Sequence, residues 1–151
     1  MLDIDSIMRL LDWNNPQSEQ EKGRELAKDV ECINVFVQPL SEHFNKNVWE
    51  NCARILVERT DRELQPYLSS LLLWLEDMNW PGADIILKRL KEYRVDNVLH
   101  LVLKEKIREA NALDKINWLM TLCELRIFYD EQVMDTVDNT LLKAQGRFPF
   151  S

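Results

Sequence analysis

The sequence predicts an all-α fold, a stack of antiparallel helical hairpins with about eight helices. Three observations lead to this prediction. Helix-forming residues dominate the composition, and only three Gly and five Pro occur among 151 residues. Apolar residues recur at three- and four-residue spacing through most of the chain. An Asp-x-Asn-x-Pro corner occurs twice, at residues 12–16 and 77–81, and each time it separates two apolar runs.

The N-terminal part is expected to hold two helices and an irregular stretch. Residues 3–12 form a short helix, and the first corner leads into a peripheral helix that opens with a capping box at Ser18 and Glu21. Residues 32–37 are rich in β-branched side chains, and without a partner strand they predict a short helix or a packed extended segment. Residues 38–47 predict a loop.

The central helices have recognisable starting signals. Asn47 is a suitable N-cap for the third helix. Thr60 and Glu63 form a capping box that opens the next helix, which is expected to run to Met78. This helix is apolar on more than one side, so we expect it to be central.

The second corner is expected to join two helices tightly. Asn79 ends one helix, and Pro81 occupies the first position of the next, where its missing N–H is not needed. Trp80 then covers the joint, because an indole buries a large area. The alternative is that Trp80 is an exposed anchor for a partner, and Trp13 in the first corner has the more polar setting of the two.

The C-terminal part is expected to contain the remaining helices. Asp114 opens a helix whose predicted inward face is Ile116, Leu119, Met120, Cys123 and Ile127. Asp130 opens a last helix whose predicted inward face is Val133, Met134, Val137 and Leu141. Residues 1–145 are therefore expected to form a single domain, and residues 146–151 leave the helical pattern as a frayed tail.

The charge is negative and unevenly distributed. The chain has a formal net charge of −7; up to Leu87 it carries 16 acidic and 8 basic residues, and the remainder carries 10 acidic and 11 basic residues. An acidic chain repels phosphate backbones, so no nucleic-acid partner is expected. The acidic half would attract a basic protein.

The cysteines and the apolar runs indicate the compartment. Cys32, Cys52 and Cys123 are widely spaced and odd in number, which argues against a disulfide framework or a zinc site. The N-terminus is acidic and lacks an apolar signal region. No apolar run approaches the ~20 residues that span a bilayer, so we expect no membrane partner and a cytoplasmic location.

No motif for a cofactor or a metal is present. The three glycines lie far apart, so no phosphate loop forms, and no nucleophile elbow or His-Glu-x-x-His pair exists. His43 and Cys52 would make a nucleophile pair, but Cys52 falls on the inward face of its helix and fits a buried structural thiol better. We therefore predict a protein that is not an enzyme and binds no cofactor or metal.

One carboxylate cluster leaves an alternative open. Glu76 and Asp77 are adjacent at the second corner, and Asp84 follows soon after. A hydrolase would use such carboxylates, although no histidine or further ligand accompanies them. The competing prediction is a protein-interaction surface at the corners, formed by Trp13, Glu76, Asp77, Trp80 and Asp84.

The densest resemblance to a known family centres on the second corner. The stretches that carry it are Trp49-Glu50-Asn51-Cys52-Ala53, residues 61–68, and Trp74-Leu75-Glu76-Asp77-Met78-Asn79-Trp80-Pro81 with its flanks. They resemble a small bacterial family of unknown function with a Trp-Leu-x-Asp-x-Asn-Trp-Pro core.

This resemblance implies a HEAT-like, short right-handed α-solenoid similar in style to helical immunity proteins that neutralise toxins. It implies no catalytic residues. Some HEAT-like repair enzymes bind DNA, but the acidity of this chain disfavours that function. We therefore expect a protein-interaction module with a basic protein partner.

Overall fold

The computed structural model describes residues 3–95 and 97–136. Every regular element in this part of the chain is a helix, which confirms the predicted all-α class. The elements are α1 (Ile4–Leu10), α2 (Gln17–Ala27), η1 (Ile33–Phe36), α3 (Lys46–Val57), α4 (Asp61–Leu64), η2 (Gln65–Tyr67), α5 (Leu68–Trp74), α6 (Ala83–Lys91), α7 (Val98–Ala112) and α8 (Ile116–Thr136). Because α4, η2 and α5 follow one another without interruption, the described α-helices form seven units instead of about eight, with the 3-10 helix η1 counted separately.

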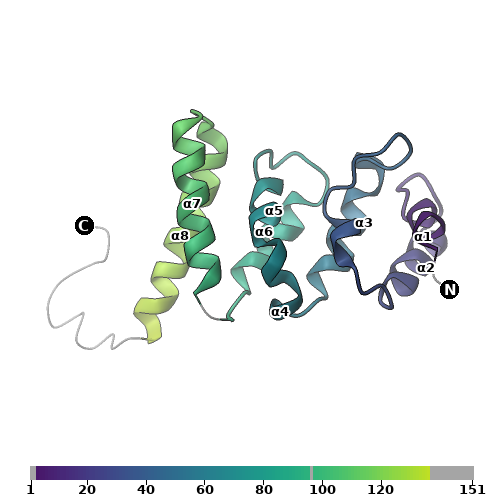
Figure 1. Cartoon of the computed structure of the whole chain (residues 1–151), viewed down its shortest axis with the longest axis horizontal. Coiled ribbons are helices and arrows are strands. Elements are labelled where there is room, and N and C mark those ends of the chain that lie inside the picture. The colour runs from purple at the N-terminus through teal and green to yellow at the C-terminus, as the bar shows by residue number, and fades with distance from the viewer. Residues whose placement is uncertain (1–2, 96, 137–151) are drawn as a thin grey trace, which may run out of the picture.

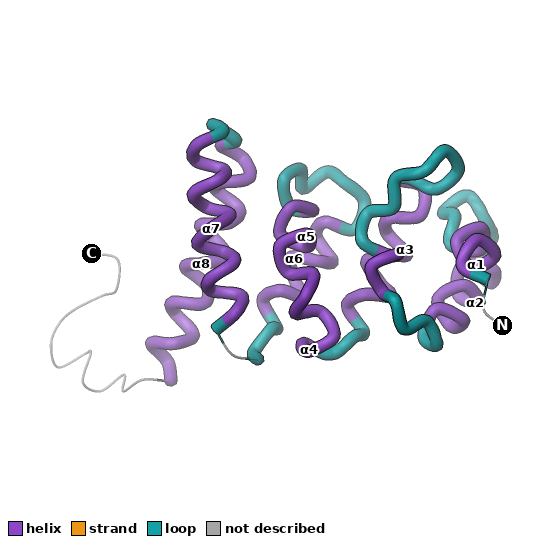
Figure 2. Tube along the Cα trace, in the orientation of Figure 1, coloured by secondary structure: helices purple, strands orange, loops and turns teal. Residues whose placement is uncertain are grey.

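The helices stand side by side in one row, with α1 and α2 at one end and α7 and α8 at the other (Figure 1). Contacts link the row in sequence: α2 packs on α3, α3 on α6, α5 on α7, and α6 on α8. The connecting loops gather along the edges of the row, where successive helices end (Figure 2). The core runs along the row between the helices.

Two arginines connect neighbouring helices of the row by donating hydrogen bonds to the carbonyl groups at the ends of α2 and α3. Arg59 donates to the carbonyl oxygens of Ala27 at 2.8 Å and Val30 at 2.9 Å, just where α2 ends. Arg89 on α6 donates to the carbonyl of Val57 at 3.1 Å and to that of Arg59 at 2.9 Å, where α3 ends. The last carbonyls of a helix have no partner within the helix, so these bonds satisfy groups that would otherwise be exposed or orphaned.

Helix α8 makes the corresponding bonds at the other end of the row. The hydroxyl of Tyr129 shares its one proton between the carbonyl oxygens of Leu90 and Tyr93, where α6 ends. The indole of Trp118 donates to the carbonyl of Leu72 at 3.0 Å. Burial raises the pKa of Tyr129 to about 12, so its hydroxyl remains a donor at neutral pH.

The predicted helix starts agree with the structure to different degrees. The Thr60–Glu63 capping box forms in full, with each side chain accepting from the other residue's backbone N–H. Helix α3 begins at Lys46 and takes Asn45 as its N-cap, so the prediction of Asn47 is wrong by two residues. The Asn47 side chain instead accepts from the N–H of Asn45 at 2.8 Å, which holds the approach to the helix.

The first hairpin differs from the prediction at its second helix. Helix α2 begins at Gln17 with Pro16 as its N-cap and has no side-chain cap bond, so the capping box at Ser18 and Glu21 is wrong. The fixed φ of proline starts the helix before Ser18 is reached. Residues 33–36 form the 3-10 helix η1, which confirms the expected short helix there.

The predicted inward face of α8 is wrong for three of its five residues, whereas Leu119 is partly buried against the core. Ile116, Met120 and Ile127 are 63%, 65% and 46% exposed. The buried side chains lie on the opposite face: Trp118, Leu122, Leu125 and Tyr129. The predicted break at Asp130 is also wrong, because α8 continues to Thr136. The side chains of residues 133–145, the domain boundary at 145 and the tail 146–151 lie outside the part that is described.

Candidate interaction site

The second corner is a tight turn stabilised by the Asp77 side chain. Helix α5 ends at Trp74, earlier than the predicted end at Met78. Asp77 Oδ1 then accepts from the N–H of Asn79 at 2.8 Å, and its carbonyl accepts from the N–H of Trp80 at 3.0 Å. An aspartate that bonds its own chain two residues on favours a turn over further helix, which accounts for the early end.

The first corner repeats these hydrogen bonds. Asp12 Oδ1 accepts from the N–H of Asn14 at 2.9 Å, and the Asp12 carbonyl accepts from the N–H of Asn15 at 3.0 Å. Asn15 does not cap α2, although an asparagine before a proline is a suitable N-cap residue. Its amide instead donates to the carbonyls of Arg9 at 2.6 Å and Leu10 at 3.2 Å, so it satisfies the end of α1.

The start of α6 depends on Gly82 and not on Pro81. Helix α6 begins at Ala83, and Gly82 is its N-cap with a φ of +87°. A Cβ at Gly82 would lie 2.7 Å from the Cβ of Ala53, so the close approach of α3 also requires glycine here. Pro81 precedes the cap, and its carbonyl accepts from the indole of Trp74 at 3.0 Å. The prediction that Pro81 is the first helical residue is therefore wrong.

The two corner tryptophans have different surroundings. Trp80 is half-buried and packs edge-on against Trp49 with ring centroids 5.7 Å apart, so it covers the joint in part. Trp13 is 46% exposed and lies in the first corner between α1 and α2. The structure places these two indoles in different hairpins of the row.

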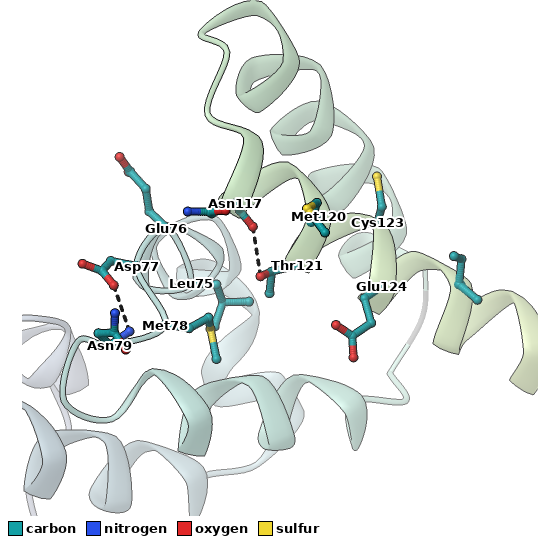
Figure 3. A pocket seen from close by; sticks show the side chains of 11 residues that line it. Leu75, Glu76, Asp77, Met78, Asn79, Asn117, Met120, Thr121, Cys123 and Glu124 are labelled. Carbon is teal, nitrogen blue, oxygen red and sulfur yellow. Dashed lines mark hydrogen bonds between the residues drawn. The ribbon is translucent and has the colours of Figure 1, made fainter.

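An open groove of about 930 Å³ lies between the second corner and α8 (Figure 3). Of the five residues predicted for the interaction surface, Glu76 and Asp77 line it, whereas Trp13, Trp80 and Asp84 do not. The lining side chains are Leu75, Glu76, Asp77, Met78, Asn79, Asn117, Met120, Thr121, Cys123, Glu124 and Ile127.

The carboxylates of the groove are separated and differ in their partners. Glu76 forms a 2.5 Å ion pair with Lys115, and one oxygen of Asp77 is used in the corner turn. Glu124 is 69% exposed and has Lys91 at 4.0 Å. Figure 3 shows Glu76 and Asp77 on one side of the groove and Glu124 on the other. Among the described residues, no group of three or more His, Cys, Asp or Glu side chains is placed to hold a metal ion.

The apolar side of the groove was not predicted as a site. The helical spacing of Met120 and Ile127 predicts core positions, yet both side chains line the groove and are exposed. The signal in the sequence was a second apolar stripe on the same helix, formed by Trp118, Leu122, Leu125 and Tyr129. A helix that is apolar on two faces needs cover on both.

The remaining nucleophile candidate is enclosed. Cys52 on α3 is fully buried, and burial raises the pKa of its thiol. His43 is exposed and packs edge-on against Phe44. This supports the interpretation of Cys52 as a structural thiol.

The fold and the groove together define an all-helical domain with an open groove beside its second corner. Its sequence shows which family this is: residues 45–143 match the family described as Domain of unknown function (DUF5071). The match covers more than half of the 151 residues, and the chain belongs to this family. All residues that line the groove fall within the match.

No curated protein and no solved structure matches the chain. The expected membership of a family of unknown function is confirmed at that level. Among the described helices, none combines the length and the apolar character that crossing a bilayer requires.

Proposed function

We propose that the chain is a non-enzymatic protein-interaction module that binds a basic partner protein in the cytoplasm. In this proposal the helices form a HEAT-like stack of antiparallel hairpins, a short right-handed α-solenoid. The role that fits best is that of a bacterial immunity protein, which neutralises a basic toxin by covering part of its surface.

The composition of the groove carries this proposal. Three of its eleven lining residues are acidic and none is Lys, Arg or His. Met120 and Ile127 add exposed apolar area to the same groove. Exposed apolar side chains bordered by charges of one sign are typical of protein-binding surfaces, where the apolar area gives affinity and the charge selects the partner.

The charge of the whole chain supports a basic partner. A net charge of −7, concentrated before Leu87, would steer a positively charged protein towards the row of helices and speed its association. The three cysteines are free thiols, as is usual in the reducing cytoplasm. The paired Glu76 and the turn-bound Asp77 fit a binding surface better than a hydrolase.

Affinity capture tests the proposed function. The tagged full chain is used as bait in extracts of its native host at low and high salt, with the tag alone as control. We expect a basic protein that is retained at low salt and released at high salt, because charge attraction is screened. Recovery of no specific partner at either salt would refute the proposal. A neighbouring toxin gene whose product is neutralised on co-expression would establish the immunity role.

A further inference from the structure

The outward face of α8 carries an apolar stripe with the spacing of a helix–helix seam. Ile116, Met120, Cys123 and Ile127 follow one another at intervals of four, three and four residues. This is the spacing by which one helix packs along another. The buried stripe from Trp118 to Tyr129 has the same spacing and is offset by two residues, which places it on nearly the opposite face at 100° per residue.

The outward stripe has no cover within the described part of the chain. Ile116 and Met120 are each more than 60% exposed, and Met120 lines the groove together with the half-buried Met78. Apolar side chains on both walls, Met78 at the corner and Met120 on α8, therefore line a space that is open to solvent (Figure 3). A small molecule would leave these walls uncovered, whereas a helix about 10 Å across would contact both.

The shape of the chain favours a helical occupant over an extended one. An extended peptide gains affinity by adding to the edge of a sheet, and the described part of the chain offers no strand. The stripe from Ile116 to Ile127 covers three helical turns, so a partner helix of about 12–15 residues would match its length of roughly 16 Å.

The charge at the groove favours a basic partner over a second copy of this chain. Asp77 and Glu124 are exposed at opposite sides of the groove. Glu76 is paired with Lys115 at 2.5 Å, whereas Glu124 has only the distant Lys91 at 4.0 Å. In a symmetric dimer through this face, the acidic residues of one groove would face those of the other copy, and like charges at an interface are unfavourable. Lys or Arg side chains would complement them.

We propose that this groove binds one amphipathic α-helix of the partner protein, with its apolar stripe along α8 and its basic side chains towards Asp77 and Glu124. The proposal rests on the proposed function and names the surface and the form of the ligand. Methionines at 78 and 120 suit such a site, because their flexible side chains adapt to different apolar neighbours.

A set of three synthetic peptides tests the site on the full chain. The first has about 14 residues with leucines at helix-seam spacing and flanking lysines. The second carries glutamate in place of lysine, and the third has the first peptide's composition in scrambled order. Fluorescence anisotropy measures affinity, and circular dichroism measures helix gained on binding. We expect the first peptide to bind as a helix and the other two to bind at least about tenfold more weakly.

Matched variants locate the binding surface. Met120→Ser removes apolar area from the groove, and Leu101→Ser removes it from an equally exposed position on α7. Glu124→Lys reverses a groove charge, and Glu105→Lys reverses an exposed charge on α7. We expect each groove variant to weaken the first peptide at least about tenfold and each α7 control to change its affinity less than about twofold.

Several results would overturn the proposal. If the glutamate peptide binds as tightly as the lysine peptide, the partner helix need not be basic. If Met120→Ser and Glu124→Lys leave the affinity of the first peptide unchanged, the peptide does not bind in this groove. If the chain self-associates and Met120→Ser abolishes this, the groove is occupied by a second copy of the chain. If the peptide binds only after Leu141→Ser and Leu142→Ser, the groove is occupied by the chain's own C-terminal segment. If a basic partner is captured equally well by the wild type and by both groove variants, the proposed function holds and only the proposed binding groove is refuted.

Discussion

Replacing Arg89 tests whether the inter-unit arginines hold the row of helices together. The Arg89 side chain is 11% exposed, and its guanidinium forms a 2.6 Å ion pair with Asp61, itself 16% exposed. The same guanidinium binds the carbonyls of Val57 and Arg59 at the end of α3. Arg89→Ala therefore leaves one largely buried carboxylate and two helix-end carbonyls without these partners.

The expected cost follows from this loss. Removing one member of a buried ion pair costs about 3–5 kcal/mol, because the remaining charge stays desolvated. For a chain of this length, a loss of about 4 kcal/mol lowers Tm by about 8–16 °C. Arg89→Lys keeps the charge but not the planar fork that binds three acceptors, so it should fall between the wild type and Arg89→Ala.

Urea denaturation followed by circular dichroism measures the free energies of unfolding. Lys88→Ala, an exposed neighbour on the same helix, is the control and should stay within about 0.5 kcal/mol of the wild type. A double-mutant cycle with Asp61→Ala should give a coupling of at least about 1 kcal/mol. A loss below about 1 kcal/mol for Arg89→Ala, or no coupling to Asp61, would refute the reasoning.

Three further predictions follow from single residues. Burial alone would raise the pKa of Asp61, but the N–H of Arg94 and the guanidinium of Arg89 lower it below its usual value. The Asp61 carboxylate thus stabilises the fold above its usual pKa near ~4, and this stabilisation is lost as the pH falls through the lowered pKa of the folded state. Urea denaturation at a series of pH values below 5 should show the loss, and Asp61→Asn should make the free energy of unfolding less dependent on pH in this range. Gly82→Ala should cost about 2–5 kcal/mol in the same assay, from a positive φ and the contact with Ala53, and a cost under about 1 kcal/mol would contradict the close approach. A thiol reagent should modify exposed Cys32 in the folded protein and buried Cys52 only after denaturation, as mass spectrometry of the labelled peptides would show.

The helical class and several boundaries followed from local sequence patterns. The Thr60–Glu63 capping box was predictable because all of its bonding partners lie within four residues. The 3-10 helix at residues 33–36 was one of two alternatives that the absence of a partner strand left open. The corner at Asp77 was recognisable, but its turn begins before Met78, because the aspartate side chain competes with the helix for backbone N–H groups.

The orientation of α8 could not be predicted from periodicity. Two apolar stripes with identical spacing lie on opposite faces, and periodicity gives no means of choosing between them. The choice depends on Trp118 and Tyr129, whose polar atoms reach carbonyls far along the chain. For the same reason Met120 and Ile127 were placed in the core, and the groove was missed. The requirement for glycine at position 82 could not be predicted for a similar reason, because it comes from close contact with Ala53 on another helix.

The bonds between units also set an order for folding during synthesis. The end of α2 is completed by Arg59 and the end of α3 by Arg89, each 32 residues further along the chain. The end of α6 is completed by Tyr129, which follows Leu90 by 39 residues. As the chain leaves the ribosome, each helix end must therefore wait for the next unit to emerge. The hydrogen bonds at the helix ends are therefore completed in order from the N-terminus to the C-terminus, each only after the following helix has been synthesised.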